Sequence, residues 1–260
     1  MVDRGSGTPI VLIPGLQGRW EWTSPAVDAL AKHHRVITFS LCDERSSLFP
    51  CDPQRGFENY LDQIDRAFTQ ARIERAVIAG VSYGGLIATE FAARNPERVS
   101  ALVLVNALHS SWEPTDQQRR YLSAPMLTSP MFVATGPQRW RPEMVAAMPS
   151  LMERLKFTLA AGARVLMAPA NPSRMARRIA WAKSHRFADP RAVKAPVLLV
   201  TGEPELDRIV PVDVTRRYLD EFKEAEHVVV RRTGHLGMAT RPDAFADVLE
   251  RFVNGLSVPA

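Results

Sequence analysis

The sequence predicts an α/β fold, a mostly parallel central sheet flanked by helices, with an inserted helical lid. Three observations predict this class: short apolar runs alternate with helix-patterned segments, the runs are continuously apolar, and the alternation stops between residues 109 and 190. Strands that helices cover on both faces are apolar on both sides, so continuous runs indicate a buried parallel sheet. A chain of 260 residues is long enough for one such domain with an insertion.

Six apolar runs are the predicted strands, and they lie at residues 10–13, 36–39, 76–81, 101–105, 197–201 and 228–230. Apolar residues recur at steps of three and four over 57–71 and again over 242–256, which predicts an amphipathic helix in each segment. A helix over 86–94 ends before Asn95-Pro96, because proline cannot continue it. Right-handed crossovers would bring the carboxyl ends of the strands to one edge, where ligands bind.

The region 109–190 is the predicted lid, and residues 1–108 and 191–260 are the predicted core. Prolines punctuate the region, and its longest helical candidates are 143–165 and 171–185. Its basic residues have two interpretations, a solvated helix face or electrostatic guidance of an anionic substrate. The residues concerned are Arg174, Arg177, Arg178 and Arg186.

Composition excludes several classes of function. The net charge is +5, but the arginines are scattered without the basic stripe and interleaved aromatics of a nucleic-acid site. Cys42 and Cys51 have no second pair with which to form a zinc site, so free thiols are expected. The N-terminal apolar run is too short for a signal peptide, and no run approaches the ~18 apolar residues that span a bilayer. We therefore expect a cytoplasmic protein with no nucleic-acid or membrane partner.

The pentapeptide Gly80-Val81-Ser82-Tyr83-Gly84 is the strongest functional signal, since it follows a predicted strand and precedes a helix-patterned stretch. A serine at a sharp strand-to-helix turn needs small flanking residues, because the bend is strained and the two elements pack closely. A side chain at Gly80 or Gly84 would clash. This context makes Ser82 the candidate nucleophile.

A serine hydroxyl needs a histidine as base and a carboxylate to orient that histidine. His235 follows the last predicted strand and so belongs on the loop edge that Ser82 shares. The other histidines precede a strand, begin one or belong to the lid region; they are His33, His34, His109, His185 and His227. Asp207 lies in the loop after strand 197–201, where Glu203 and Glu205 compete with it. Asp207 is favoured because the apolar residues beyond it would make its turn rigid. Asn106 ends another strand and is interpreted as a turn residue.

The order Ser82, Asp207, His235, together with the GxSxG turn and the inserted region, resembles the α/β-hydrolase fold superfamily over nearly the whole chain. The resemblance implies an oxyanion hole formed by the backbone amides of Leu16 and Tyr83, and no metal or organic cofactor. Pro14 stands where the family often has histidine. Residues 42–46 replace the family's frequent Asp-Arg-Gly turn.

The resemblance implies a serine hydrolase that cleaves a small carboxylic ester, lactone or thioester through an acyl-enzyme intermediate. Carbon–carbon bond hydrolysis, amide cleavage and perhydrolysis use similar residues and stay open as alternatives. A non-catalytic protein that binds a small ligand is the alternative from another class. In each case the partner is a small molecule, and the sequence leaves the oligomeric state open.

Overall fold

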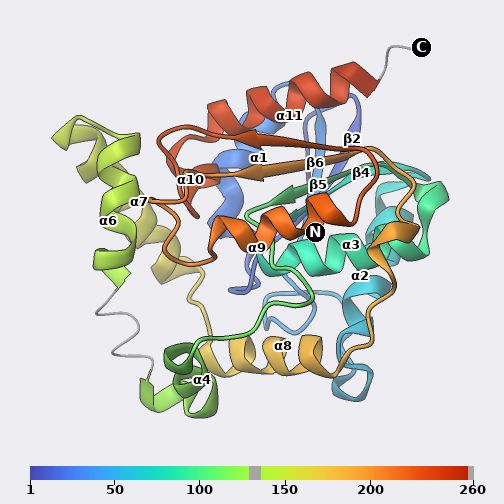
Figure 1. Cartoon of the computed structure of the whole chain (residues 1–260), viewed down its shortest axis with the longest axis horizontal. Coiled ribbons are helices and arrows are strands. Elements are labelled where there is room, and N and C mark those ends of the chain that lie inside the picture. The colour runs from blue at the N-terminus through green and yellow to red at the C-terminus, as the bar shows by residue number, and fades with distance from the viewer. Residues whose placement is uncertain (129–135, 257–260) are drawn as a thin grey trace.

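A computed structural model of the chain describes residues 1–128 and 136–256, in which helices pack against both faces of a seven-stranded sheet (Figure 1). The strand order is β1-β3-β2-β4-β5-β6-β7, with β1 antiparallel to β3 and every other pair parallel. The strands are β1 (Val2–Arg4), β2 (Pro9–Ile13), β3 (Arg35–Thr38), β4 (Ala76–Val81), β5 (Val99–Val105), β6 (Val197–Thr201) and β7 (Ala225–Val229). The predicted α/β class is confirmed.

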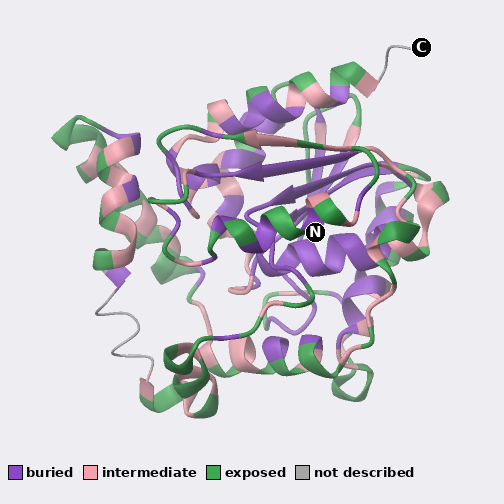
Figure 2. Ribbon diagram, viewed as in Figure 1, coloured by how far each residue is buried: buried purple, intermediate pink, exposed green. Residues whose placement is uncertain are grey.

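Each central strand divides its side chains between two cores. Ile10 and Leu12 of β2 pack in the core under α1 (Ser24–Leu30) and α11 (Pro242–Leu256). Val11 and Ile13 point the other way, into a larger core under α2 (Glu58–Ala71) and α3 (Tyr83–Arg94). All four side chains are fully buried, as the period of two along a strand requires. Figure 2 shows the buried strands between these two helical layers.

The remaining helices lie in the segment between β5 and β6 and in the C-terminal part of the chain. They are α4 (Asp116–Ser123), α6 (Gly136–Ala147), α7 (Leu151–Met167), α8 (Pro172–Ser184), α9 (Val212–Arg216) and α10 (Gly237–Thr240). Short 3-10 helices cover Trp20–Thr23, Pro53–Arg55, Pro96–Arg98, Pro190–Ala192 and Arg217–Asp220. Helices α4 and α8 lie below the larger core in Figure 1, while α6 and α7 lie beside the carboxyl ends of the strands.

The insertion differs from the sequence prediction in one helix. The predicted helix over 143–165 is wrong, because the chain leaves helical structure at Met148–Ser150 and forms two helices, α6 and α7. Pro149 lies at that break, where its missing N–H and its ring disfavour continuation of the helix, although α6 itself contains Pro142. The predicted helix over 171–185 is confirmed as α8. The parts of the predicted lid at 129–135 and of the predicted core at 257–260 lie outside the described residues.

Two short elements had no signal in the hydrophobic pattern. Strand β1 at the sheet edge contains Asp3 and Arg4 and is held by antiparallel pairing with β3. Helix α1 has seven residues, too few for a clear period. Among the described residues, none of the helices has the length and apolar character that crossing a membrane requires.

Candidate active site

Ser82 lies at the sharp turn between β4 and α3, with φ 53° and ψ −116°. A non-glycine residue at such dihedral angles stores strain on the order of 1–3 kcal/mol. The turn is possible because its neighbours are small: a Cβ at Gly80 would lie 2.3 Å from the Gly84 carbonyl oxygen. A Cβ at Gly84 would lie 2.5 Å from the Ile13 carbonyl oxygen. The structure therefore leaves no room for a side chain at Gly80 or Gly84, as predicted.

Backbone hydrogen bonds fix this turn to the next strand. The Ser82 amide donates to the Val105 carbonyl at 2.9 Å, and the Ser82 carbonyl accepts from the Leu108 amide at 3.0 Å. The Ser82 residue is only 8% exposed. Because β5 and the loop that follows it both hold the turn, the serine occupies one defined position at the carboxyl edge of the sheet.

His235 and Asp207 form a hydrogen-bonded pair on the neighbouring loops, with His235 Nδ1 3.1 Å from Asp207 Oδ2. The other oxygen, Asp207 Oδ1, accepts from the amides of Ile209 and Val210, both at 3.0 Å. The Asp207 side chain is fully buried, whereas Glu205 is exposed. The structure thus brings His235 together with Asp207, the favoured of the three carboxylates.

The pairing lowers the pKa of Asp207 and raises the pKa of His235, as expected for an ion pair. Burial alone would raise the pKa of Asp207, but the His235 charge and the hydrogen bonds to Oδ1 and Oδ2 lower that pKa below its ordinary value. Burial would lower the pKa of His235, yet the Asp207 carboxylate, with a smaller contribution from Glu143, raises it. The carboxylate is therefore ionised at neutral pH and stabilises a protonated imidazole beside it.

Asn106, at the end of β5, connects the loop of His235 to the loop of Asp207. Its Nδ2 donates to the Gly234 carbonyl at 3.1 Å, and its Oδ1 accepts from the Gly202 amide at 3.1 Å. The residue is buried at φ 43°. Asn106 is a turn residue, as predicted, and its side chain also bridges three strand ends, for which no local pattern is a signal.

This bridge brings the His235 loop back toward the strand beside Ser82. Gly234 contacts Asn106, and Asn106 follows Val105, the backbone partner of Ser82. Among the described residues, no hydrogen bond joins Ser82 Oγ to the His235 imidazole. Catalytic hydrogen bonds are often long in ligand-free enzymes and tighten when substrate binds.

The amides of Leu16 and Tyr83, the predicted oxyanion-hole donors, come from two segments near Ser82. Tyr83 is the first residue of α3, where helical amides have no partner within the helix. Leu16 follows Gly15, at which a Cβ would lie 3.4 Å from the Cβ of Ser82. Within the described part of the chain neither amide donates a hydrogen bond, so both remain available to an acceptor near the serine.

Glu143, on α6, was not singled out from the sequence, yet it is buried against the His235 loop. Its Oε2 accepts from the Leu236 amide at 2.9 Å, and its Oε1 accepts from Thr240 Oγ1 at 3.0 Å. Burial raises the pKa of this carboxyl, opposed by its hydrogen bonds and by the nearby imidazole of His235. Arg232 makes a second link to α6, because it donates to the last carbonyls of that helix, at Ala146 and Ala147.

A hydrogen bond between a serine and an imidazole exists away from this turn. Ser111 Oγ lies 2.7 Å from His109 Nδ1, and Glu221 Oε2 lies 3.0 Å from Nε2 of the same ring, off hydrogen-bond alignment. The Ser111 amide also donates to Nδ1, and Arg217 donates to Ser111 Oγ. Ser111 is an exposed loop residue without the strained turn of Ser82, so its contacts are those of a local loop motif.

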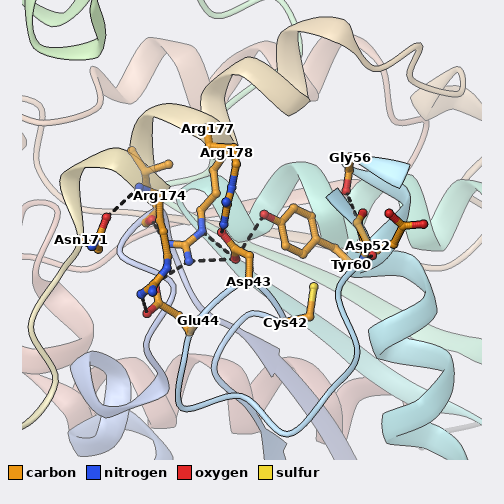
Figure 3. Close-up of polar contacts among 12 residues, drawn as sticks. Cys42, Asp43, Glu44, Asp52, Gly56, Tyr60, Asn171, Arg174, Arg177 and Arg178 are labelled. Atoms are coloured by element: carbon orange, nitrogen blue, oxygen red, sulfur yellow. Dashed lines mark hydrogen bonds and ion pairs between the residues drawn. The ribbon is translucent and has the colours of Figure 1, made fainter. Parts of the chain in front are cut away.

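Three of the four basic residues lie on α8 and form ion pairs within the protein, which neither interpretation predicted. Figure 3 shows Arg174, Arg177 and Arg178 reaching from α8 to Asp43 and Glu44 in the loop after β3. The Arg178 side chain is fully buried, as are both carboxylates to within 1%. Burial alone would lower the pKa of Arg178, but Asp43 and Glu44 raise it above its ordinary value. Of the four arginines, only Arg186 is exposed without a salt bridge in the described residues.

No group of three or more metal-ligating side chains gathers in the described part of the chain. Cys42 is buried, Cys51 is half-buried, and both are free thiols, as expected.

Comparison with known proteins gives one family. A model of the Alpha/beta hydrolase family matches residues 10–248. A candidate carbamate hydrolase, RutD, of Azorhizobium caulinodans is 27% identical over 264 residues, 95% of this chain and 92% of the relative. A 2-hydroxy-6-oxononadienedioate/2-hydroxy-6-oxononatrienedioate hydrolase of Paraburkholderia xenovorans is 26% identical over 275 residues, 96% of this chain and 89% of the relative.

Among solved structures, the esterase EaEST of Exiguobacterium antarcticum superposes with a TM-score of 0.78. The alignment covers 97% of this chain and 94% of the esterase at 16% identity, so it bears on the fold alone.

Proposed function

Because the chain belongs to the Alpha/beta hydrolase family, we propose that it is a serine hydrolase that cleaves a small carboxylic ester, lactone or thioester through an acyl-enzyme intermediate. One observation carries the proposal. The strained, glycine-flanked Ser82 shares a sheet edge with the buried His235–Asp207 pair, and in the described part of the chain the amides of Leu16 and Tyr83 donate no hydrogen bond. A nucleophile, a base and an acid that orients the base are what acyl transfer requires.

In the proposed reaction Ser82 Oγ attacks the substrate carbonyl carbon while its proton passes to His235 Nε2. Asp207 holds the imidazole through Nδ1 and stabilises the imidazolium. The Leu16 and Tyr83 amides donate to the oxyanion, and each such donor contributes on the order of 3 kcal/mol of transition-state stabilisation. The leaving group departs with the proton from Nε2. Water then attacks the acyl-enzyme with His235 as base, which releases the acid and restores the serine.

We further propose that residues 109–190 form a lid over a core of residues 1–108 and 191–260. The helical segment between β5 and β6 supports this division, since α6 lies against the loop of His235. A lid in that position would set the size and polarity of the acyl group that reaches Ser82.

A second candidate reaction uses the same residues on another bond. The RutD relative is named for a carbamate, and the Paraburkholderia relative is named for a hydroxy-keto diacid rather than an ester. An amidase or carbon–carbon bond hydrolase is therefore the alternative within the enzyme class. A protein that binds a small ligand without turnover remains the alternative outside it.

Turnover of a substrate panel by wild type, Ser82→Ala and Ser111→Ala tests the proposal. The panel holds p-nitrophenyl esters, lactones, thioesters, an aryl carbamate and an aryl amide of matched acyl length. We expect ester-type substrates to give the highest kcat/KM, Ser82→Ala to lower it by at least 10³-fold, and Ser111→Ala to leave it within twofold. The control removes Ser111, whose hydroxyl bonds to His109, so it separates the role of Ser82 from a general effect of losing a hydroxyl.

A fluorophosphonate probe should label wild type at Ser82, as peptide mapping would show. Labelling at any other serine would contradict the nucleophile. A preference for the carbamate or amide would favour the second reaction, and turnover equal in wild type and Ser82→Ala would reject a serine mechanism.

A further inference from the structure

Arg178 has more contacts than the neutralisation of its charge requires. Its Nε and Nη2 donate to Asp43 Oδ1 at 3.1 and 2.8 Å, and Nη2 also donates to Glu44 Oε1. These contacts occupy one side of the guanidinium group. The remaining Nη1 donates instead to the backbone carbonyl of Leu16, at 2.7 Å.

Two other arginines already compensate the same carboxylates. Arg174 pairs with Glu44 at 2.8 Å, and Arg177 pairs with Asp43 at 3.2 Å. Burying a third cation is costly unless each of its donors finds a partner. The acidic pair alone therefore does not explain why Arg178 is fully buried, and its contact with the Leu16 loop needs a separate explanation.

The Arg178 guanidinium also fits against the Leu16 loop by shape. Gly18 has φ 74°, and a Cβ there would lie 2.3–2.4 Å from the Nη1, Cζ and Nη2 atoms of Arg178. The loop is closed by a hydrogen bond of 2.9 Å from the Gly18 amide to the Gly15 carbonyl. Only glycine at position 18 lets the guanidinium lie against the loop.

These contacts fix the two peptide planes that flank Leu16. In a trans peptide the carbonyl and the following N–H point in opposite directions. The Gly15 carbonyl is held by the Gly18 amide, so the Leu16 N–H points away from the interior of the turn. The Leu16 carbonyl is held by Arg178, which fixes the next plane. The peptide planes before and after Leu16 are thus both held by hydrogen bonds, and this fixes the direction of the Leu16 N–H.

Arg178 also contacts the residue that follows Ser82, through its own backbone carbonyl. The Tyr83 hydroxyl donates to the Arg178 carbonyl at 2.8 Å, and the Tyr83 side chain is fully buried. Tyr83 is the residue whose amide lies next to Ser82. One residue of α8 therefore holds both Leu16 and Tyr83, which belong to segments 67 positions apart in the sequence.

We propose that Arg178 is a positioning residue that sets the spacing and direction of the two oxyanion-hole amides, those of Leu16 and Tyr83, from the inserted helix α8. The inference rests on the proposed function, since it presupposes that these amides bind an oxyanion. Arg178 itself is too deeply buried to touch substrate; it acts through the loop of Leu16 and the side chain of Tyr83.

Replacing Arg178 with lysine is the direct test. An ammonium group keeps the positive charge beside Asp43 and Glu44, but it lacks the fork that reaches both the carboxylates and the Leu16 carbonyl. Complete loss of an oxyanion donor lowers kcat by about 10²–10³-fold. A misdirected donor should lose less, so we expect kcat to fall about 10- to 100-fold with KM within threefold.

Arg174→Lys and Arg177→Lys are matched controls. They change the same residue type on the same helix against the same two carboxylates, but among the described residues neither side chain forms a hydrogen bond with Leu16 or Tyr83. Both should keep kcat within threefold of wild type. A loss in the controls as large as in Arg178→Lys would show that only the charge balance of the cluster matters, and would overturn the proposal.

The specific readout is the ratio of kcat for an ester to kcat for the matching thionoester. A developing sulfur anion accepts weaker hydrogen bonds than an oxyanion, so a well-directed pair of amides favours the oxygen substrate. The ratio should fall about tenfold in Arg178→Lys and stay unchanged in both controls. A folded Arg178→Lys enzyme with wild-type kcat and wild-type ratio would overturn the inference.

The comparison of wild type with Ser82→Ala is made first on the same ester. If turnover does not depend on Ser82, the proposed function fails and the inference falls with it. If turnover depends on Ser82 but the ratio does not respond to Arg178, the inference alone fails.

Tyr83→Phe decides the matter should Arg178→Lys fail to fold, as circular dichroism and thermal melting would show. It removes only the hydroxyl that reaches α8 and leaves the buried charges in place. We expect kcat and the ester-to-thionoester ratio each to fall about three- to tenfold. Wild-type values for both would overturn the proposal.

Discussion

Replacing Asn106 with alanine should loosen the loop of His235 and lower both stability and activity. The asparagine side chain is the donor to the Gly234 carbonyl and the acceptor for the Gly202 amide. Alanine removes both hydrogen bonds and leaves two buried backbone groups without these partners. It also places a side chain without local hydrogen bonds at φ 43°.

The magnitude follows from these losses. Each buried partner left unsatisfied costs about 1–3 kcal/mol. The Gly234 carbonyl keeps a long contact of 3.4 Å from the Gly237 amide, which places its share at the lower end. Alanine in the left-handed region adds about 1 kcal/mol. We therefore expect the free energy of unfolding to fall by about 3–5 kcal/mol, a large part of the stability of an ordinary domain.

Urea unfolding and steady-state kinetics together measure the effect. A small displacement of the imidazole lowers the rate steeply, so kcat/KM should fall about 10- to 100-fold. Asn106→Gly is the matched control, because glycine loses the same two bonds but accepts the positive φ; it should be about 1 kcal/mol more stable than Asn106→Ala. If Asn106→Ala unfolds at the wild-type urea concentration and keeps kcat/KM within twofold, the bridge does not hold the histidine loop.

Three further outcomes are expected. Asp207→Asn should lower kcat by about 10⁴-fold, because the amide favours the wrong tautomer of His235, whereas Glu205→Gln should leave kcat within twofold; similar kinetics for the two variants would reject Asp207. Glu143→Gln should lower the pKa of His235, since the carboxylate raises it, so the rising limb of the kcat/KM profile should move to lower pH; an unmoved limb would contradict the contact. Burial lowers the pKa of His34, whose two ring nitrogens have no partner in the described structure, so the unfolded chain binds the proton more readily and stability falls as pH drops below about 6.5. His34→Leu should lose less stability between pH 7 and pH 5 than wild type in urea titrations, and an equal loss would show that this imidazole does not contribute.

The hydrophobic pattern predicted the parts of the fold that are long or continuously apolar. The runs at 76–81 and 197–201 are β4 and β6 with unchanged bounds, and the stripe over 57–71 is α2 with one residue fewer. The turn at Ser82 was predictable because its requirement is local: Gly80 and Gly84 are needed by the backbone on the spot. Order along the chain and position after a strand were enough to place His235 and Asp207 on one edge.

The contacts that support these residues could not be predicted, since each joins segments far apart in sequence. Glu143 lies 93 positions before Leu236, and Arg178 lies 135 positions after Asp43. A lone glutamate or arginine on a helix has the same local signature whether it is solvated or buried. Burial is decided by the partner that the fold brings to it, and no periodicity within α6 or α8 encodes that partner.

These two buried charges give the insertion a role in both halves of the candidate site. Glu143 extends from α6 to the loop of His235, and Arg178 extends from α8 to the loop of Leu16. A buried ion cannot leave its partner without a penalty of several kcal/mol. Motions that lift either helix as a whole would therefore separate a buried charge from its partners. Helix α7 between them has no buried side chain, and the buried residue that follows it, Ala168, accepts a hydrogen bond from Trp22 Nε1. Opening toward a substrate should thus be concentrated in α7 itself, with Ala168 and the segments of α6 and α8 that contact the core staying in place.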